Sequence, residues 1–226
     1  LSLYLFRSHA THGVMRLARQ TFSVTTLPKK ENLLNGTKSE LVEKFIDLGM
    51  KKYTAMQVND WIYKKGVFSF KDMTNISKHH RALLQERFDI FPGDIKQCQT
   101  SKDGTKKWLL QFEGKDGVTK NSDIETVYIP TESTLEHSRR AQSAFSDQEV
   151  AVFDERGSVC VSSQVGCSLT CSFCHTGTMS KRMLRNLTSG EIVGQVLTAK
   201  KELGEFDSMR TATDPRRVSN VVFMGM

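Results

Sequence analysis

The chain has 226 residues, of which 38% are hydrophobic and 25% are charged, which is typical of a globular protein with one or two domains. No apolar run reaches the roughly 18 residues that a membrane span needs, so we expect a soluble protein without a membrane partner. The net charge of +7 comes from basic doublets spread along the chain, which favours a polyanionic partner such as RNA. An ordinary solvated basic surface would show the same charge.

The first thirty residues have the composition of an organelle transit peptide. They contain Arg7, Arg16 and Arg19, several Ser and Thr, and no acidic residue before Glu31. A merely disordered leader would have the same composition, so both interpretations stay open. The chain also starts at Leu rather than Met and ends within an apolar run, which favours a fragment.

Three helices are predicted in the part of the chain that follows. Thr37 and Glu40 form a capping box at the start of the first helix, and Thr54 is expected to cap the second. Apolar residues at helical spacing predict a third helix over residues 77–88. Together these helices predict a small basic domain over residues 37–92.

The apolar pattern then changes to a period of two residues. This alternation predicts strands over residues 106–112 and 124–130, within a β segment that covers residues 96–130. Residues 131–157 are polar and acidic, and we interpret them as an exposed insertion or linker without chemistry of its own.

The last third of the chain predicts a βαβ unit, which places the protein in the α/β class. A strand is expected over residues 158–165, and Thr188 with Glu191 forms the capping box of the following helix. Residues 218–224 form a nearly continuous apolar run, which predicts a strand buried on both faces of a parallel sheet. The segment between the first strand and the helix is rich in cysteine, and such loops carry the chemistry of barrel enzymes.

Four of the five cysteines, namely Cys160, Cys167, Cys171 and Cys174, lie within fifteen residues. A disulfide framework is unusual in a long chain without a secretory signal, so metal ligation or redox chemistry is favoured. Thiolates at intervals of four and three residues can bind three irons of a cubane cluster and leave the fourth iron open to a cofactor.

Two other metal sites match part of the same pattern. Cys171-Ser-Phe-Cys174-His175 fits the attachment sequence of c-type haem, and Cys167, Cys171, Cys174 and His175 could form a zinc site. Haem attachment leaves Cys167 unexplained, and a His directly after a ligating Cys is poorly placed to reach the same zinc. The spacing therefore favours an iron–sulfur cluster.

The motif Cys-x₃-Cys-x₂-Cys, with Phe173 before its last Cys, resembles that of the radical S-adenosylmethionine (SAM) superfamily. More narrowly, the chain from about residue 37 to its end resembles the adenine carbon-2 RNA methyltransferases of the RlmN and Cfr type. The form of residues 174–178 resembles the alphaproteobacterial branch of that family. The stretches that carry the resemblance are residues 124–130, 160–174, 185–188, 190–195 and 220–226.

The resemblance implies an α/β fold in which a small N-terminal helical domain and a short β segment precede the beginning of a partial (β/α) radical SAM barrel. Residues 158–226 would be the N-terminal, truncated part of that core. Phe173 would pack beside the SAM adenine or shield the cluster, and Gly225-Met226 would open a Gly-Met-Gly-Glu motif for SAM. The implied ligands of a [4Fe-4S] cluster are Cys167, Cys171 and Cys174.

The resemblance also implies an activity, namely methylation of carbon 2 of adenosine in large-subunit rRNA, and in tRNA as a second substrate, through a methyl-cysteine intermediate. Glu125 would be the proton acceptor, and Cys160 would be the non-ligand cysteine that releases the RNA adduct through a disulfide. Without the resemblance, we would interpret Glu125 as a surface-facing carboxylate on a strand and Cys160 as a small core residue. The cysteine that carries the methyl group has no counterpart here, so this chain alone is expected to be inactive.

The implied partners are RNA and an electron donor such as a flavodoxin or ferredoxin, and the implied state is a monomer. The enzyme would be cytoplasmic in a bacterium, or located in the mitochondrion or another organelle if residues 1–30 are a transit peptide. Two alternatives remain from the residues themselves: a metal-stabilised RNA-binding module without catalysis, and a radical SAM enzyme with another substrate.

Overall fold

The structure is a computed structural model that describes residues 30–112, 122–131, 156–169, 171–178, 185–210, 214 and 216–224. The predictions for the leader, for most of the linker over residues 131–157, and for Gly225 and Met226 lie outside these residues.

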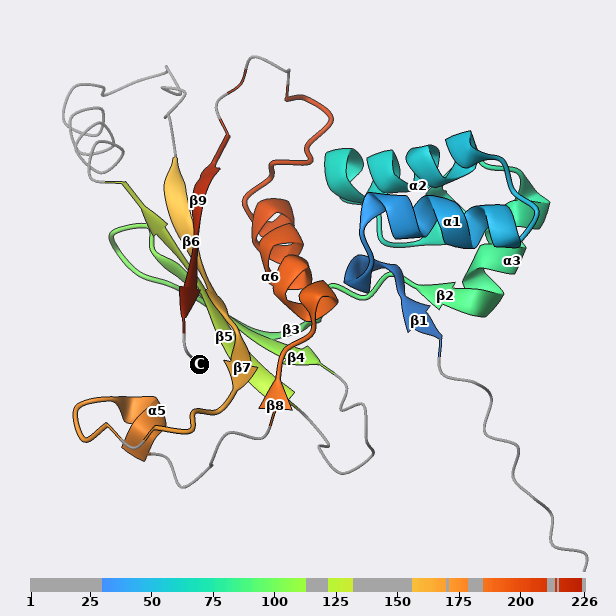
Figure 1. The fold of residues 1–226 in the computed structure, drawn as a ribbon. Coiled ribbons are helices and arrows are strands. Elements are labelled where there is room, and N and C mark those ends of the chain that lie inside the picture. Colours follow the sequence, from blue (N-terminus) through green and yellow to red (C-terminus); the bar gives the residue numbers. More distant parts are fainter. Residues whose placement is uncertain are drawn as a thin grey trace, which may run out of the picture.

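The N-terminal described part is a helical unit, drawn in blue to green in Figure 1. Two short strands, β1 (Glu31–Asn32) and β2 (Phe88–Asp89), pair in parallel and close the unit. The helices are α1 (Lys38–Asp47), α2 (Lys52–Lys65) and α3 (Lys78–Arg87), with 3₁₀ turns at η1 (Leu33–Asn35) and η2 (Phe70–Asp72).

The capping predictions for this unit are confirmed in one case and wrong in another. Thr37 and Glu40 form the expected capping box of α1. The prediction that Thr54 caps α2 is wrong, since α2 begins at Lys52 and Thr54 lies inside the helix with an exposed fraction of 2%. The physical reason is tertiary packing, because the earlier start brings Thr54 and Ala55 into the core of the unit.

The second part is a five-stranded sheet whose strand order is β3-β4-β5-β6-β9. The strands predicted over residues 106–112 and 124–130 are present, the second with two further residues at its start. The first strand was not predicted as a separate element, although residues 96–100 lie within the predicted β segment, because its sequence shows no apolar alternation. The bounds are β3 (Asp94–Thr100), β4 (Lys106–Phe112), β5 (Ser122–Pro130), β6 (Gly157–Ser162) and β9 (Val218–Met224).

The predicted βαβ unit is present, because β6 and β9 are parallel neighbours joined through α6 (Ser189–Glu202). Thr188 and Glu191 form the expected capping box of α6. The strand predicted over residues 158–165 divides into β6 and the short β7 (Gln164–Val165), which pairs with β8 (Arg185–Asn186). A short helix, α5 (His175–Thr178), lies in the loop between β7 and β8.

The prediction that residues 218–224 are buried on both faces is wrong for this structure. Val221, Val222 and Phe223 have exposed fractions of 42%, 47% and 65%. The reason is position, because β9 is an edge strand and α6 contacts β5 and β6 instead.

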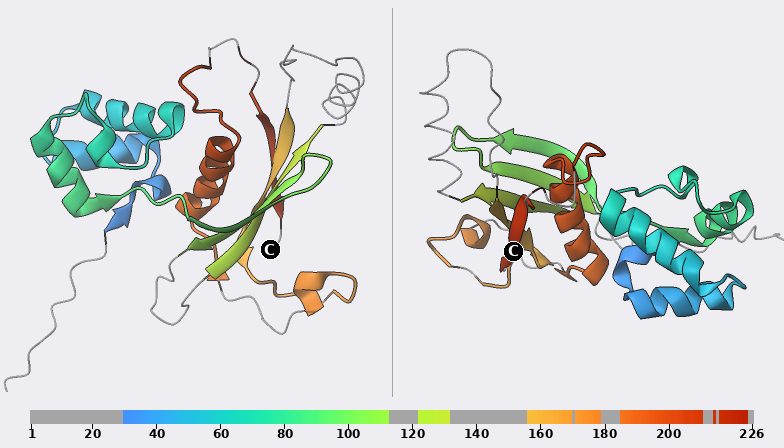
Figure 2. Two further views of the ribbon diagram at one scale, coloured as in Figure 1. Left: turned by 180° about the vertical axis from the view of Figure 1, so that it is seen from behind. Right: turned by 90° about the horizontal axis from the view of Figure 1, so that it is seen from above.

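Helix α6 lies between the sheet and the helical unit, as Figures 1 and 2 show from three directions. Its residue Leu197 belongs to the core of the helical unit, whereas Ala199 and the C-cap residue Leu203 belong to the core of the sheet. The two hydrophobic cores therefore meet at one helix. None of the helices in the described ranges is long and apolar enough to cross a membrane.

Candidate functional site

The face of the sheet opposite α6 brings together two of the candidate residues. On β5, Ser122, Ile124, Thr126 and Tyr128 are buried, so the alternate position Glu125 faces the other way. Cys160 is registered opposite Val127 on β5 and opposite Val222 on β9. Residues in register point to the same face, so Glu125 and Cys160 are diagonal neighbours on one open face.

Glu125 has a charged neighbour on the adjacent strand β4. The Nζ atom of Lys107 lies 3.1 Å from Glu125 Oε1, and both side chains are about half exposed. Beside this ion pair is a small pocket of ≈ 70 Å³, whose other lining residues are Gln97, Gln99 and Leu109. The carboxylate is thus held in place at the surface and open to solvent, whereas the sequence alone gave Lys107 no role.

The three predicted cluster ligands follow β7 in one loop at the carboxyl end of β6, beside α5 (Figure 1). The loop starts at Gly166, whose φ of 75° lies in the left-handed region that favours glycine. Cys167, Cys171 and Cys174 form no disulfide, and all three are partly buried. Cys167 Sγ accepts a hydrogen bond from the backbone N–H of Leu169 at 3.4 Å.

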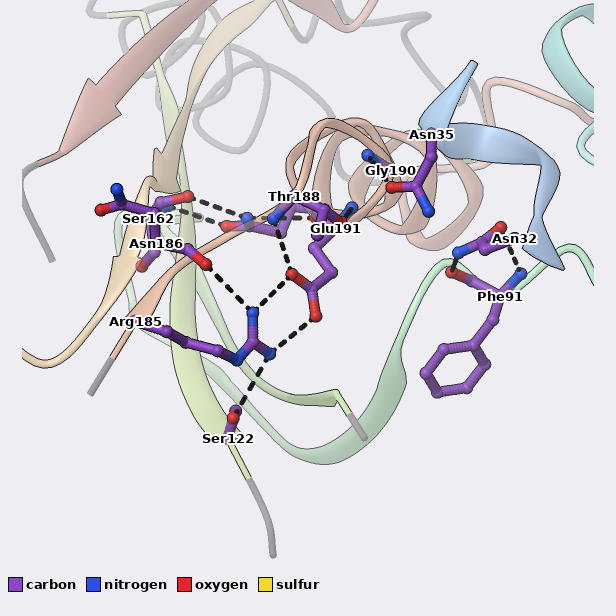
Figure 3. A network of polar contacts seen from close by, with 11 residues as sticks. Asn32, Asn35, Phe91, Ser122, Ser162, Arg185, Asn186, Thr188, Gly190 and Glu191 are labelled. Atoms are coloured by element: carbon purple, nitrogen blue, oxygen red, sulfur yellow. Dashed lines mark hydrogen bonds and ion pairs between the residues drawn. The ribbon is translucent and has the colours of Figure 1, made fainter. Parts of the chain in front are cut away.

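The ends of this loop are held together at its base. Strands β7 and β8 pair there, and the backbone N–H of Leu187 donates to the carbonyl oxygen of Ser163 at 3.0 Å. Arg185 Nη1 and Nη2 each donate to one oxygen of the Glu191 carboxylate at 2.7 Å (Figure 3). Both side chains are largely buried, and Arg185 also reaches Ser122 on β5 at 3.4 Å. A fixed base of this kind limits the positions that the cysteines can take.

The electrostatics of Glu191 follow from these contacts. Burial raises the pKa of this carboxyl, but the hydrogen bonds from Arg185 and from the backbone of Thr188, with the charge of Arg185, outweigh it. The pKa of Glu191 is therefore lowered, and the group is ionised at neutral pH.

The donor set of the loop fits an iron–sulfur cluster, since three cysteines that form no disulfide supply the soft sulfur ligands that such clusters take. Within the described residues, no three His, Cys, Asp or Glu side chains meet at the spacing of a single metal ion. The ligands of a cubane cluster bind different iron atoms, so they stand farther apart than the ligands of one ion. Phe173 has an exposed fraction of 92%, so it stands free beside these thiols.

One further residue next to the site was missed by sequence reasoning. Gln195 on α6 is completely buried, although its amide is polar. The sequence indicated a role for Gln195 only indirectly, because residues 190–195 belong to the stretches that carry the family resemblance.

Sequence comparisons with known proteins identify relatives that are described as RNA methyltransferases. Residues 31–90 match the family described as "Ribosomal RNA large subunit methyltransferase N-terminal domain". The chain is 42% identical over 223 residues to the dual-specificity RNA methyltransferase RlmN of Paracoccus denitrificans, covering 94% of this chain and 49% of the relative. It is 39% identical over 203 residues to the RlmN of Rhodopseudomonas palustris strain BisB5, covering 88% of this chain and 45% of the relative.

The fold has a solved counterpart, the crystal structure of a radical SAM methyltransferase from Sphaerobacter thermophilus. The TM-score is 0.63 at 31% identity, over 87% of this chain and 47% of that one. The chain thus spans about half the length of the proteins that it matches. By sequence along most of its length and by its α/β fold, the chain is related to about half the length of the RlmN methyltransferases and of the solved radical SAM methyltransferase.

Proposed function

We propose that the chain contains the cluster-binding part of a radical SAM enzyme that methylates carbon 2 of adenosine in large-subunit rRNA and in tRNA through a methyl-cysteine intermediate. The observation that carries this proposal is the loop at the carboxyl end of β6, where three cysteines lie above a base that β7, β8 and the Arg185–Glu191 pair hold together. The relatives named as dual-specificity RNA methyltransferases support the same reading.

Cys167, Cys171 and Cys174 would hold the [4Fe-4S] cluster, with Phe173, Gly225 and Met226 at the SAM site. When bound, the cluster and SAM supply radical chemistry, which a carbon as unreactive as carbon 2 of adenine requires. The exposure of Phe173 supports its role, since its ring is open to contact with a bound cofactor.

Glu125 and Cys160 would complete the reaction from the open face of the sheet. The Glu125 carboxylate would accept the proton that leaves carbon 2, and the Cys160 thiol would form a disulfide with the cysteine that carried the methyl group. Their position as diagonal neighbours supports these two roles, because the carboxylate and the thiol must both reach the same covalent adduct.

The helical unit, over residues 37–92, would contact the RNA around the target base. Its α2 ends in Lys64 and Lys65, and Lys65 Nζ lies 3.8 Å from the ring centre of Trp61. Exposed cations beside an aromatic ring are suited to phosphates and unstacked bases. We include in the proposal a flavodoxin-type or ferredoxin-type electron donor, a monomeric enzyme, and a location in the bacterial cytoplasm or in an organelle such as the mitochondrion.

The proposal is tested by anaerobic reconstitution of the full-length protein with iron and sulfide. We expect an absorbance band at about 400 nm that reduction bleaches. Cys171→Ala should lose this band, whereas Cys98→Ala should keep it, because Cys98 lies exposed on β3. Tight zinc binding without iron would contradict the cluster.

The substrate is tested separately by mass analysis of adenosines from rRNA and tRNA incubated with SAM and a reductant. We expect methyladenosine in rRNA and in tRNA. Its absence from both RNA classes, in a protein that holds the cluster, would reject the methyltransferase and leave a radical SAM enzyme with another substrate.

A further inference from the structure

The backbone pairing between β5 and β6 ends next to the candidate catalytic residues. The register runs from Pro130 opposite Gly157 to Val127 opposite Cys160, and no pair is formed beyond that point in these two strands. Continuing the same register would place Glu125 opposite Ser162. The segment of β5 that carries Glu125 is therefore not held to β6 by the regular ladder.

Side chains join the two strands where the ladder is missing. The amide of Gln195 on α6 binds both backbone groups of Ser162: its Nε2 donates to Ser162 O at 2.9 Å, and its Oε1 accepts from Ser162 N at 2.8 Å. The same Oε1 accepts from Thr126 Oγ1 at 2.9 Å. Ser162 Oγ then donates to the carbonyl oxygen of Glu125 at 2.7 Å. The primary amide of Gln195 thus takes the place of a strand partner.

This arrangement requires an amide. The Gln195 oxygen accepts two hydrogen bonds and its nitrogen donates two, the second to Glu191 O at 3.2 Å, so its capacity is filled. A carboxylate at this position could not donate to the carbonyl oxygens, and an apolar side chain would leave the Ser162 backbone groups and the Thr126 hydroxyl without this partner in a fully buried place.

We propose that Gln195 is a positioning residue that sets the separation of β5 and β6, and thereby the placement of the Glu125 carboxylate relative to the Cys160 thiol. The roles of Glu125 and Cys160 rest on the proposed function, whereas the positioning does not depend on it. Gln195 touches neither side chain and acts through Thr126 and Ser162.

The first test measures the accessibility of Cys160 in the full-length protein. Gln195→Glu and Gln195→Met are compared with the natural protein by alkylation with iodoacetamide, and peptide mass spectrometry reads Cys160 against the exposed Cys98 of the same molecule. We expect Cys160 to react about tenfold faster relative to Cys98, because one buried hydrogen bond left unmade shifts an opening equilibrium by about that factor. Reading both sites in one molecule corrects for differences in reagent and protein concentration, and the variants are compared at equal iron content.

Two further variants support the interpretation of the Cys160 accessibility measurement. Thr198→Val is the matched control, because Thr198 lies on the same helix, is 5% exposed and bonds to Pro92 O at 3.3 Å, away from β5 and β6. In Thr198→Val, the reactivity of Cys160 relative to Cys98 should equal that of the natural protein. Thr126→Val removes only the bond to β5 and should give a smaller change in the same direction, should the Gln195 variants fail to fold.

The second test follows the reaction with RNA on denaturing gels. In the Gln195 variants we expect protein that stays covalently linked to RNA, because release requires Glu125 and Cys160 in their places. A natural protein that makes no methyladenosine, together with a raised Cys160 ratio in the variants, would reject the proposed function and support the positioning. Variants that keep both the natural ratio and natural RNA release would overturn the positioning.

Discussion

At the scale of single residues, Arg185 and Glu191 form an ion pair whose charges are largely removed from solvent. It is bidentate, largely buried and placed at the base of the cysteine loop. We expect Glu191→Gln to lower the free energy of unfolding by about 2 to 4 kcal/mol, because it leaves the buried Arg185 guanidinium without a counter-charge. Urea denaturation would measure the change. The control is Asp60→Asn, which removes the exposed pair between Asp60 and Lys64 and should cost no more than about 0.5 kcal/mol.

Because the pKa of Glu191 is lowered in the folded protein, the contribution of this pair to stability depends on pH in a defined direction. The folded state binds the proton less tightly than the unfolded state, whose pKa is near the ordinary value of 4.5. Its contribution to stability is therefore complete above that value and is lost as the pH falls through the lower pKa of the folded state. The difference in unfolding free energy between the natural protein and Glu191→Gln should shrink in this window. A difference that stays constant down to about pH 3 would contradict the assignment.

At the scale of elements, α6 packs unusually closely on the segment that links the helical unit to the sheet. A Cβ atom on Gly194 would lie 2.6 Å from the carbonyl oxygen of Pro92 and 2.8 Å from its Cα. Alanine is favoured over glycine in a helix by about 1 kcal/mol, but here the backbone of Pro92 would have to move. We expect Gly194→Ala to destabilise the protein by about 1 to 3 kcal/mol in thermal unfolding.

A peptide of residues 188–204 separates these two effects. In isolation the same substitution should raise its helicity in circular dichroism, because no Pro92 is present. If the whole protein also became more stable with Gly194→Ala, the close approach of α6 to Pro92 would be wrong.

For the whole molecule, α6 is the element shared by both hydrophobic cores. Leu197 packs in the core of the helical unit, and Ala199 and Leu203 pack in that of the sheet. Leu197→Ala should cost about 2 to 5 kcal/mol and should raise hydrogen exchange in both units. The comparison is Leu84→Ala, at a fully buried site within α3, which should raise exchange chiefly in the helical unit. Equal exchange patterns for the two variants would show that α6 does not couple the cores.

The sequence by itself determined the features that depend on neighbouring residues. The capping boxes at Thr37 and Thr188 and the alternation in β4 were readable because each is set within a few residues. The family resemblance likewise came from short motifs. The roles of Cys167, Cys171 and Cys174 remain predictions from their spacing.

Only the tertiary structure decided which of these elements meet. It placed Glu125 and Cys160 on one face through pairing between strands that are separated by the linker, and it left β9 exposed at the edge of the sheet. It also buried the amide of Gln195 between two strands that stop pairing. None of this could be predicted from local patterns, because each outcome depends on contacts between residues far apart along the chain.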